Sequence, residues 1–555
     1  MDIPAVDFKW TSSLEKIFFR PGLEIAEYDH ATALQGEVFS LQLAYKVPFN
    51  LNKPEWSVIS DIADCVEIRY TRSIIADYFG EVVDKDNVID DTPGLYPDLL
   101  STLESYRPAG NMWQTLWLTI RIPHELAAGK YTLQLKLKHE TPYRPERKLD
   151  VVSPEFTLEV LPVHLPEADL KVTNWFYCDS ICHYYDVEPW SDRFFEIVKN
   201  YFINMRKHGQ NMIYVPMFTP PLDTFIGHER MTIQSIGVEE DAEGKLHFDF
   251  TRLERYIRLA LECGMEYLEF SHMFTQWGAK FTPKIMVKLA DGKLVRRFGW
   301  DVEAASEAYR NFLAALMPEL GRLLQKNNWL EIAYFHISDE PYESSLATYE
   351  FASKLFRANL PGARFIDALS RKEFFERGLV SIPVPSNNRL EEFRELDLPE
   401  RWTYYCVSQW KDVPNMFVNM PSARNRILGL LLYVYNIEGF LHWGFNFYLS
   451  QYSLFPIDPY LDTTAGHGFP AGDAFKVYPG KDGVPEDSIR HEVFFEAVQD
   501  LAALQLLECR SSREEVLEFI AGECGGKLPT MFEYPRSSEW LLEFRQKLNK
   551  KLAGK

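Results

Sequence analysis

The stretch LEIAYFHISDEP, residues 330–341, joins a short apolar run to two adjacent acids and a proline. The run up to Phe335 is typical of a buried β-strand, and Pro341 stops the element. Asp339 and Glu340 follow the strand although neighbouring carboxylates repel each other and are costly to remove from water. Two acids at the end of a buried strand therefore need an explanation. The order of strand-like and helical segments on either side of them predicts the fold in which they lie.

Strand-like apolar runs alternate with amphipathic helical segments from about residue 170 onward. The run KVTNWFYCDS (171–180) precedes SDRFFEIVKNYFINMRKHG (191–209), and later runs such as MEYLEFSHMF (265–274) and GFLHWGFNFYL (439–449) repeat the order. Eight such units over roughly 330 residues predict a (β/α)8 TIM-like barrel. An open doubly wound sheet is the alternative, but no G-x-G-x-x-G follows the first strand and no phosphate-binding loop is present.

The first 165 residues have a different period. In VFSLQLAYKV (38–47) and QTLWLTIRIP (114–123), apolar residues alternate with polar ones. This period of two predicts half-buried antiparallel strands, as in a β-sandwich. The predicted chain is therefore multidomain, with an N-terminal antiparallel β-sandwich, a (β/α)8 TIM-like barrel and a C-terminal helical tail. The predicted boundaries are 1–165, 170–510 and 511–555.

The charge and hydropathy of the chain exclude some classes of ligand and indicate where in the cell the protein is expected. The net charge of −21 argues against nucleic acid and anionic membrane surfaces as partners. No apolar stretch approaches membrane-spanning length, and MDIPAVDFKWTSSLEKIFF (1–19) lacks the basic and then apolar order of a secretion signal. We expect a cytoplasmic protein with a small carbohydrate or glycoside as substrate. Support of the barrel rim and contact within a homo-oligomer are the two roles considered for the sandwich.

Polar and aromatic residues follow the barrel strands, where this fold places active sites. The strand ends carry no cluster with metal-ligand spacing, no G-x-S-x-G motif and no lysine, so neither a metal nor a cofactor is expected. Carboxylates framed by aromatic residues remain, and they are typical of glycoside cleavage. Asp339 and Glu340 are the candidate catalytic residues. The candidate substrate-binding residues are Tyr177, His272, Trp277, Asn387, Tyr404, Tyr405, Trp443 and Asn446.

Purely structural roles compete with these assignments. Asp339 and Glu340 could cap the following helix, although a cap requires only one acid. His272 and Trp443 could be core residues, because histidine and tryptophan are often buried for packing. The insertions after the second and third strands could be decorative, although loops above a barrel mouth more often shape the substrate site.

Three segments together resemble a known domain. They are the acidic pair, RNRILGLLLYVYNIEGFLHWGFNFY (424–448) and AFKVYPGKDGVPEDSIRHEVFFEAVQDL (474–501). The barrel, about 170–510, resembles the domain of unknown function 4091, which includes glycoside hydrolase family 123. The activity of that family is β-N-acetylgalactosaminidase, and its members also carry an N-terminal β-sandwich. The resemblance implies a retaining exo-glycosidase.

The resemblance also implies substrate-assisted catalysis, in which the 2-acetamido oxygen of the sugar attacks its own anomeric carbon. Glu340 would then protonate the leaving oxygen and later deprotonate water, while Asp339 would hold the acetamido N–H. Tyr404, Tyr405 and Trp443, and next Trp277, would form the acetyl pocket and the sugar platform.

The remaining candidates have less specific roles. Asn387, Asn446 and His272 would contact sugar hydroxyls. Arg426 matches an R-x-L motif of the family and would either bind substrate or brace the barrel.

Two alternatives remain open from the residues alone. A conventional retaining glycosidase on a sugar without the acetamido group would use Glu269 or Asp367 as nucleophile, about 5–5.5 Å from Glu340. A non-catalytic carbohydrate-binding protein is the second alternative, because a fold does not guarantee an activity.

Overall fold

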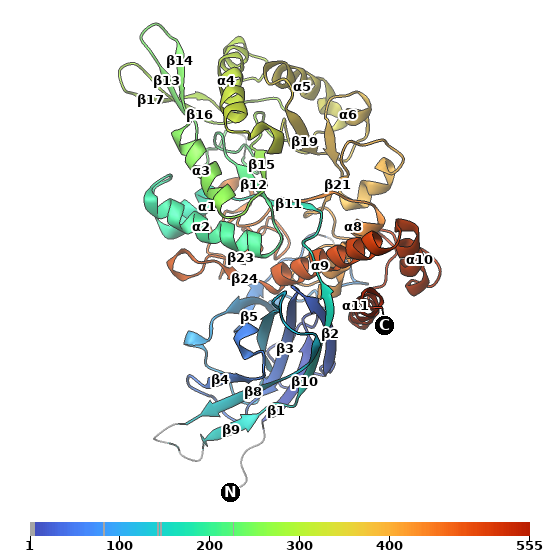
Figure 1. Cartoon of the computed structure of the whole chain (residues 1–555). Coiled ribbons are helices and arrows are strands. Elements are labelled where there is room, and N and C mark those ends of the chain that lie inside the picture. Colours follow the sequence, from blue (N-terminus) through green and yellow to red (C-terminus); the bar gives the residue numbers. More distant parts are fainter. Residues whose placement is uncertain (1–5, 82–83, 141–143, 145–146, 226, 555) are drawn as a thin grey trace.

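The computed structural model describes every residue except 1–5, 82–83, 141–143, 145–146, 226 and 555. Two five-stranded sheets pack face to face in the N-terminal part, below the barrel in Figure 1. The first sheet has the order β1 (Asp7–Ser12), β3 (Val38–Lys46), β7 (Gln114–Arg121), β5 (Val66–Ala76) and β6 (Gly94–Ser101). The second has the order β2 (His30–Gln35), β10 (Phe156–His164), β8 (Gly129–His139) and β4 (Glu55–Ile59), with β9 (Leu149–Val152) also on β8.

The alternating pattern of the first domain is explained by this packing. Leu41 lies opposite Leu118 and Leu43 opposite Leu116 in the pairing of β3 with β7, and all four are fully buried in the sandwich core. Successive side chains on a strand point to opposite faces, so only every second residue enters the core. The predicted sandwich is confirmed, and one of its strand pairs, β2 with β10, is parallel.

Eight parallel strands form the barrel, in an order that follows the chain. They are β11 (Lys171–Asn174), β12 (Met212–Val215), β15 (Tyr267–Phe270), β18 (Ala333–Phe335), β19 (Arg364–Ala368), β20 (Ile382–Val384), β21 (Trp402–Tyr404) and β22 (Gly439–His442). β22 pairs with β11, and a parallel bridge from Ser386 to Tyr404 joins the end of β20 to β21. The predicted TIM-like barrel is therefore confirmed.

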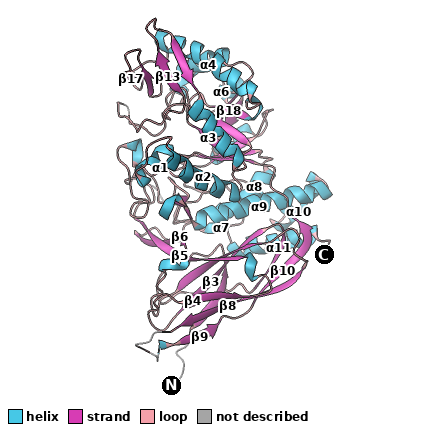
Figure 2. Ribbon diagram, turned by 60° about the vertical axis from the view of Figure 1, so that its left-hand side comes forward, coloured by secondary structure: helices cyan, strands magenta, loops and turns pink. Residues whose placement is uncertain are grey.

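Helices follow the strands and surround the barrel (Figure 2). They are α1 (Cys178–Tyr185), α2 (Asp192–Lys207), α3 (Thr251–Glu262), α4 (Glu307–Lys326), α5 (Leu346–Asn359), α6 (Glu373–Glu376), α7 (Ser422–Arg426), α8 (Leu428–Val434) and α9 (Ile489–Arg510). The sixth unit has a 3-10 helix, Asn387–Phe393, in place of an α-helix. Its buried residues Asn387, Leu390 and Phe393 are three apart, which matches three residues per turn.

The two insertions join in one small sheet. β13 (Gly237–Glu240) and β14 (Leu246–Asp249) come from the insertion after β12, and β16 (Ile285–Lys288) and β17 (Leu294–Phe298) come from the one after β15. They pair in the order β14-β13-β16-β17. Figure 1 shows this sheet at the far end of the barrel from the sandwich.

The last barrel helix, α9, lies between the barrel and the sandwich (Figure 1). Sixteen of its 22 residues are buried, so it is covered on all sides and not only along one stripe. The tail forms α10 (Arg513–Glu523) and α11 (Ser538–Leu552), and Asn549 of α11 donates a hydrogen bond to Thr32 O of β2 at 3.1 Å. Among the described residues, no helix has the length and apolarity to cross a membrane.

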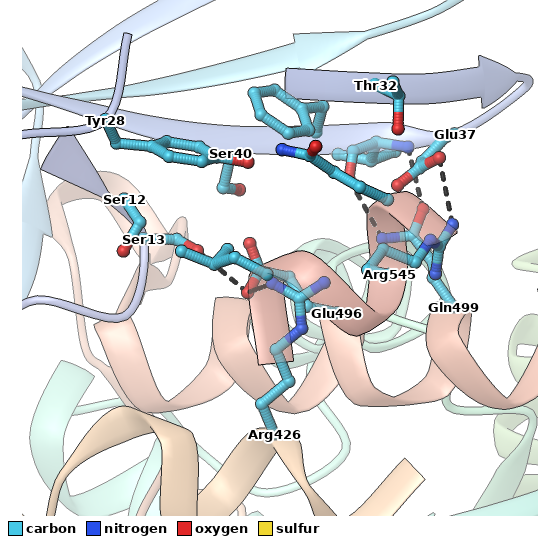
Figure 3. Close-up of a pocket in the computed structure, with 14 residues that line it drawn as sticks. Ser12, Ser13, Tyr28, Thr32, Glu37, Ser40, Arg426, Glu496, Gln499 and Arg545 are labelled. Atoms are coloured by element: carbon cyan, nitrogen blue, oxygen red, sulfur yellow. Dashed lines mark hydrogen bonds and ion pairs between the residues drawn. The ribbon is translucent and has the colours of Figure 1, made fainter. Parts of the chain in front are cut away.

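Arg426 belongs to this junction and not to the barrel mouth. Its guanidinium pairs with Glu496 at 3.1 Å and Asp500 at 2.8 Å, both on α9. Asp500 also pairs with Arg545 of α11 at 2.6 Å, and Arg545 reaches Glu37 at 3.0 Å. Figure 3 shows Arg426, Glu496, Arg545 and Glu37 around a small cavity. Its volume of about 20 Å³ is room for about one water molecule. Of the two roles considered for Arg426, the structure shows bracing.

Candidate active site

A cavity of about 200 Å³ opens at the carboxyl ends of the barrel strands. Its lining comes from residues at the end of, or just after, strands β11, β15, β18, β19, β21 and β22, and from the longer loops after β12 and β22. Six of the ten candidate residues line it, namely Tyr177, Trp277, Asp339, Glu340, Tyr404 and Trp443.

Asp339 and Glu340 lie side by side in this lining, just past β18. The Trp277 amide donates to Asp339 O at 2.8 Å, and the Glu340 amide donates to Ala368 O at 3.0 Å. Neither acid caps α5, which begins at Leu346 and whose N-cap residue Ser345 makes no side-chain cap hydrogen bond. The backbone of Glu340 has φ 42°, a conformation that non-glycine residues rarely adopt. The pair is thus held in place by its backbone, and both residues line the cavity.

Burial and the closeness of the two carboxyl groups both shift the pKa values of Asp339 and Glu340. Burial raises the pKa of Asp339 well above its ordinary value, and the charge of Glu340 raises it further. Burial also raises the pKa of Glu340, whereas the Tyr404 hydroxyl, which donates to Oε1 of Glu340 at 2.6 Å, opposes that rise. Because the two carboxyls interact, they titrate as a unit and share a proton over a range of pH.

A buried layer of charged groups lies beneath the pair. His336 Nε2 contacts Glu269 at 2.6 Å, and its Nδ1 contacts Asp367 at 3.0 Å. Burial alone would lower the pKa of His336, but hydrogen bonds to Asp367 and Glu269 raise it to about 9. His336 is therefore an imidazolium at neutral pH, held between two carboxylates.

Glu269 and Asp367, the two nucleophiles considered for the conventional mechanism, are both fully buried in this layer and do not line the cavity. Glu269 also accepts hydrogen bonds from Thr173 and from Trp175 at 2.8 Å. Their lone pairs are occupied by protein donors, so neither is placed to attack a sugar.

Aromatic side chains form much of the remaining wall. Tyr177 and Trp443 meet edge to face, with ring centroids 6.4 Å apart. Trp443 donates from Nε1 to Asp473 at 3.0 Å, which fixes the orientation of the indole. Burial raises the pKa of Asp473 to about 7, although the hydrogen bond from Trp443 acts to lower it.

Four candidates lie outside the lining. His272 stacks on His336 at 4.2 Å, Asn387 donates to Pro414 O at 2.9 Å, and Tyr405 donates to Asn425 at 3.2 Å. Tyr405 follows Tyr404 directly, and adjacent residues in an extended segment point in opposite directions, so only one of them faces the cavity.

The fourth, Asn446, supports the wall from behind. Its side chain accepts from the Tyr177 amide at 2.8 Å and donates to Tyr177 O at 3.1 Å. Asn446 thereby fixes the backbone of a residue that does line the cavity.

Asp223 is a third acid of the cavity, and it does not follow a strand directly. It lies in the insertion after β12, where its carboxylate accepts from the Tyr452 amide at 2.8 Å. Burial raises the pKa of Asp223 to about 7. Its only signal in the sequence is its place in an insertion expected to shape the site, because no periodic pattern extends to it.

Several residues that line the cavity have a strained backbone conformation with positive φ. Asp223, Trp277, Glu340 and Tyr452 all line it, and all have positive φ, at 39°, 62°, 42° and 58°. Each such residue costs free energy that the surrounding contacts must offset, and such residues cluster at functional sites. The concentration of strain supports this cavity as the active site.

Two groups of described residues could approach a metal ion. In the first, His272, His336 and Asp367, both ring nitrogens of His336 already contact carboxylates. The second, His208, Asp487 and His491, adjoins the Arg69 guanidinium, which pairs with Asp487 at 2.5 Å. A fixed cation disfavours a second one at the same carboxylate.

Comparison with known proteins agrees with this architecture. The sequence matches the model of the glycoside hydrolase 123 catalytic domain over residues 175–507 and that of the glycoside hydrolase 123 N-terminal domain over residues 47–139. A comparison with curated proteins finds no match.

Among solved structures, a family 123 glycoside hydrolase from Clostridium perfringens, described in terms of glycolipid glycan hydrolysis, aligns with 99% of this chain and 98% of its own. The TM-score is 0.74 at 14% sequence identity, which is a likeness of fold. A β-D-glucuronidase from Dictyoglomus thermophilum covers 80% of this chain and 68% of its own, with a TM-score of 0.33 and 10% identity. A family 5 mannosidase from Rhizomucor miehei covers 63% and 94%, with a TM-score of 0.32 and 12% identity.

The catalytic-domain match spans more than half of the chain and includes all three acids of the cavity. The chain therefore belongs to glycoside hydrolase family 123.

Proposed function

We propose that the protein is a retaining exo-β-N-acetylgalactosaminidase that uses the 2-acetamido group of its substrate as the nucleophile. The observation that carries this proposal is the pair of adjacent acids, Asp339 and Glu340, which line one cavity while Glu269 and Asp367 are fully buried outside its lining. Substrate assistance requires no carboxylate nucleophile, so this arrangement is sufficient for it.

In the first step, the acetamido oxygen forms a bond to the anomeric carbon and the glycosidic C–O bond breaks. Glu340 transfers its proton to the departing oxygen. In the second step, water attacks the anomeric carbon, the bond to the acetamido oxygen breaks, and the Glu340 carboxylate accepts the proton of the water. Two displacements at one carbon retain its configuration.

Asp339 would act on the acetamido group. A carboxylate that accepts the N–H orients the amide and stabilises the positive charge of the oxazolinium-like intermediate. In the free protein burial and the charge of Glu340 raise the pKa of Asp339 strongly, which favours its protonated form. Binding of the amide N–H favours the charged form of Asp339, so the shared proton would move to Glu340 as the substrate binds.

The size and walls of the cavity suit one sugar. At about 200 Å³ it is smaller than the usual pocket for a drug-sized ligand, which supports removal of a terminal residue. Trp443 and Tyr177 would supply the sugar platform, while Tyr404 and Trp277 would flank the acids. The family 123 enzyme of C. perfringens is described in terms of glycolipid glycan hydrolysis, which supports a glycoconjugate as the substrate class.

A panel of aryl β-glycosides with and without the 2-acetamido group tests the proposal. We expect cleavage of the N-acetylgalactosaminide, no cleavage of the plain galactoside, and tight inhibition by a thiazoline analogue that mimics the cyclised intermediate. Rapid cleavage of the plain galactoside without thiazoline inhibition would overturn the mechanism. In that case Asp223, the remaining acid of the cavity, becomes the candidate nucleophile, and Asp223→Asn should abolish turnover.

A further inference from the structure

Asp223 is an acid of the barrel cavity that has no role in the mechanism proposed above. It is part-exposed and lines the cavity together with Asp339 and Glu340. Among the residues that the structure describes, its carboxylate accepts one hydrogen bond, from the Tyr452 amide at 2.8 Å. A carboxylate has about four acceptor positions, so most of those of Asp223 are open to a ligand.

The charge of Asp223 is not balanced by an ion pair with any of the described residues. Arg230 is the cation that acts on it, but its guanidinium pairs with Asp179 at 2.7 Å and donates to Leu222 O at 3.0 Å. Burial raises the pKa of Asp223 to about 7, although the hydrogen bond from Tyr452 and the charge of Arg230 act to lower it. A ligand that brings hydrogen-bond donors would therefore stabilise the carboxylate.

Asp223 and the acid pair can contact the same sugar. Burial raises the pKa of the Tyr177 hydroxyl well above its ordinary value, and the negative charges of Asp223 and Asp339 both raise it further. Both carboxyls therefore lie within electrostatic range of one hydroxyl. The cavity has a volume of about 200 Å³, and all three residues line it. A sugar with its anomeric carbon at Glu340 would present its other hydroxyls to the rest of this wall.

The hydrogen-bond donors of the substrate determine what Asp223 can accept. A hexosaminide carries its amide N–H, which the mechanism gives to Asp339, and the hydroxyls at C3, C4 and C6. We propose that Asp223 accepts hydrogen bonds from one or two of these hydroxyls and is thereby a specificity-determining residue for the sugar. This inference rests on the proposed function, because it requires a sugar bound at the acid pair.

Asp223→Asn, combined with deoxygenated substrates, tests the contact. Asparagine keeps an acceptor for the Tyr452 amide and loses the charge. The substrates are the aryl β-N-acetylgalactosaminide and its 3-deoxy, 4-deoxy and 6-deoxy analogues. On the parent glycoside, kcat/KM of the variant should fall about ten- to hundredfold, as for a lost hydrogen bond to a charged group.

The loss should depend on which hydroxyl the substrate lacks. On an analogue without a contacted hydroxyl, the loss caused by Asp223→Asn should be at least about three times smaller than on the parent, because the charge has lost its donor. On the other analogues the loss should equal that on the parent. Each comparison uses two proteins and one substrate, so the intrinsic reactivity of the analogue cancels.

Ser453→Ala is the matched control. The Ser453 hydroxyl donates to the main-chain oxygen of Asp223 at 2.7 Å, so it joins the same two loops without binding the carboxylate. Ser453 does not line the cavity. Any loss in Ser453→Ala should have the same factor on the parent and on every analogue. Thermal melts of both variants separate a lost contact from a loss of folding.

Three results would overturn the inference. In the first, Asp223→Asn lowers kcat/KM by one common factor on all four substrates, as expected of a residue that only supports the wall. In the second, it changes none of them. In the third, it abolishes turnover of every substrate, as loss of a nucleophile would.

Failure of the proposed function has a different signature, because none of the four substrates lacks the acetamido group. If a plain glycoside is cleaved equally well, the mechanism fails and the same comparison uses the deoxy analogues of that glycoside. If no glycoside is cleaved, calorimetric titration of methyl N-acetylgalactosaminide and its deoxy analogues measures the same differences as binding affinities. Equal affinities of the wild type and Asp223→Asn for all of them would then overturn the inference.

Discussion

Glu340 and Asp339 cannot both carry a charge at low cost in one small cavity. Burial raises the pKa of each, and the charge of Glu340 raises that of Asp339 further. The hydroxyl of Tyr404 is the protein group that favours the charged form of Glu340. At the residue scale, therefore, the pKa of Glu340 depends on burial and one hydrogen bond, whereas that of Asp339 depends on burial and a neighbouring charge.

Replacing Glu340 by glutamine removes the proton donor and keeps the size of the side chain. We expect Glu340→Gln to lower kcat on a natural glycoside about 10²- to 10⁴-fold, with substrate affinity nearly unchanged. Steady-state kinetics and calorimetric titration measure the two quantities. Glu343→Gln, an exposed glutamate three residues further on, is the matched control and should keep full activity. Full turnover by Glu340→Gln on a poor leaving group would contradict the acid role.

Tyr404→Phe should shift the pH profile of kcat/KM. The lost hydrogen bond stabilises charged Glu340, so its removal raises the pKa of Glu340 further. A general acid works in its protonated form, and activity falls as pH rises through that pKa. The basic limb should therefore move to higher pH.

Tyr405→Phe is the control for this shift, because the hydroxyl of Tyr405 donates to Asn425 and does not line the cavity. Its profile should match that of the wild type. A basic limb that stays in place or moves to lower pH in Tyr404→Phe would disprove the role assigned to the hydrogen bond.

At the scale of elements, the end of β18 is held by its neighbour β19. Asp367 accepts from the amides of Ile337 at 3.0 Å and Ser338 at 3.3 Å, and from the hydroxyl of Tyr349. β18 has only three residues, so the ladder ends before the acids begin. Asp367 therefore holds the two residues that precede the acids, while the acids themselves are held by the backbone hydrogen bonds to Ala368 and from Trp277.

Asp367→Asn removes the charge that pairs with His336 and replaces an acceptor by a donor. Breaking such a buried pair costs about 3–5 kcal/mol of stability, and kcat should fall because the acids lose their support. Urea unfolding and steady-state kinetics measure the two effects. Asp249→Asn is the control, because Asp249 is an exposed acid that accepts a hydrogen bond from the Thr251 amide. We expect it to lower the free energy of unfolding by less than about 1 kcal/mol. Equal losses in the two variants would exclude a special role for Asp367.

At the scale of the whole molecule, α9 serves both domains. Arg490 of α9 pairs with Asp98 of β6 at 2.9 Å, and Gln499 of α9 exchanges two hydrogen bonds with the backbone of Val38 in β3. Because the same helix also packs in the barrel, the sandwich cannot separate without exposing buried charges. The two domains should therefore unfold together.

Asp98→Asn tests this coupling. It removes the charge that balances buried Arg490, so we expect a loss of about 3–5 kcal/mol and one calorimetric transition that moves as a whole. Glu67→Gln, which breaks an exposed pair with Arg121 at 3.9 Å, should change stability by less than about 0.5 kcal/mol. Two separate transitions, with only the first one moved, would contradict coupled unfolding.

Periodicity along the chain was enough to predict the two-domain architecture and to single out Asp339 and Glu340. Alternation with a period of two in residues 38–47 reflects burial of one strand face, and repeated strand–helix units from residue 170 reflect a barrel. Both patterns arise from local geometry, because side-chain direction along a strand or helix repeats at fixed intervals. Asp339 and Glu340 could be found for the same reason, since they follow a strand whose end this fold directs to the active site.

Which residues share the cavity depends on how the elements pack in three dimensions. It places Tyr404 in the wall and Tyr405 behind it, brings Asp223 in from an insertion, and buries His272 on His336. It also assigns Arg426 to the junction with α9. These relations join residues far apart in the chain, and they depend on how the barrel closes and how the domains dock. No periodic pattern encodes such contacts, because each is fixed by the packing of several elements at once.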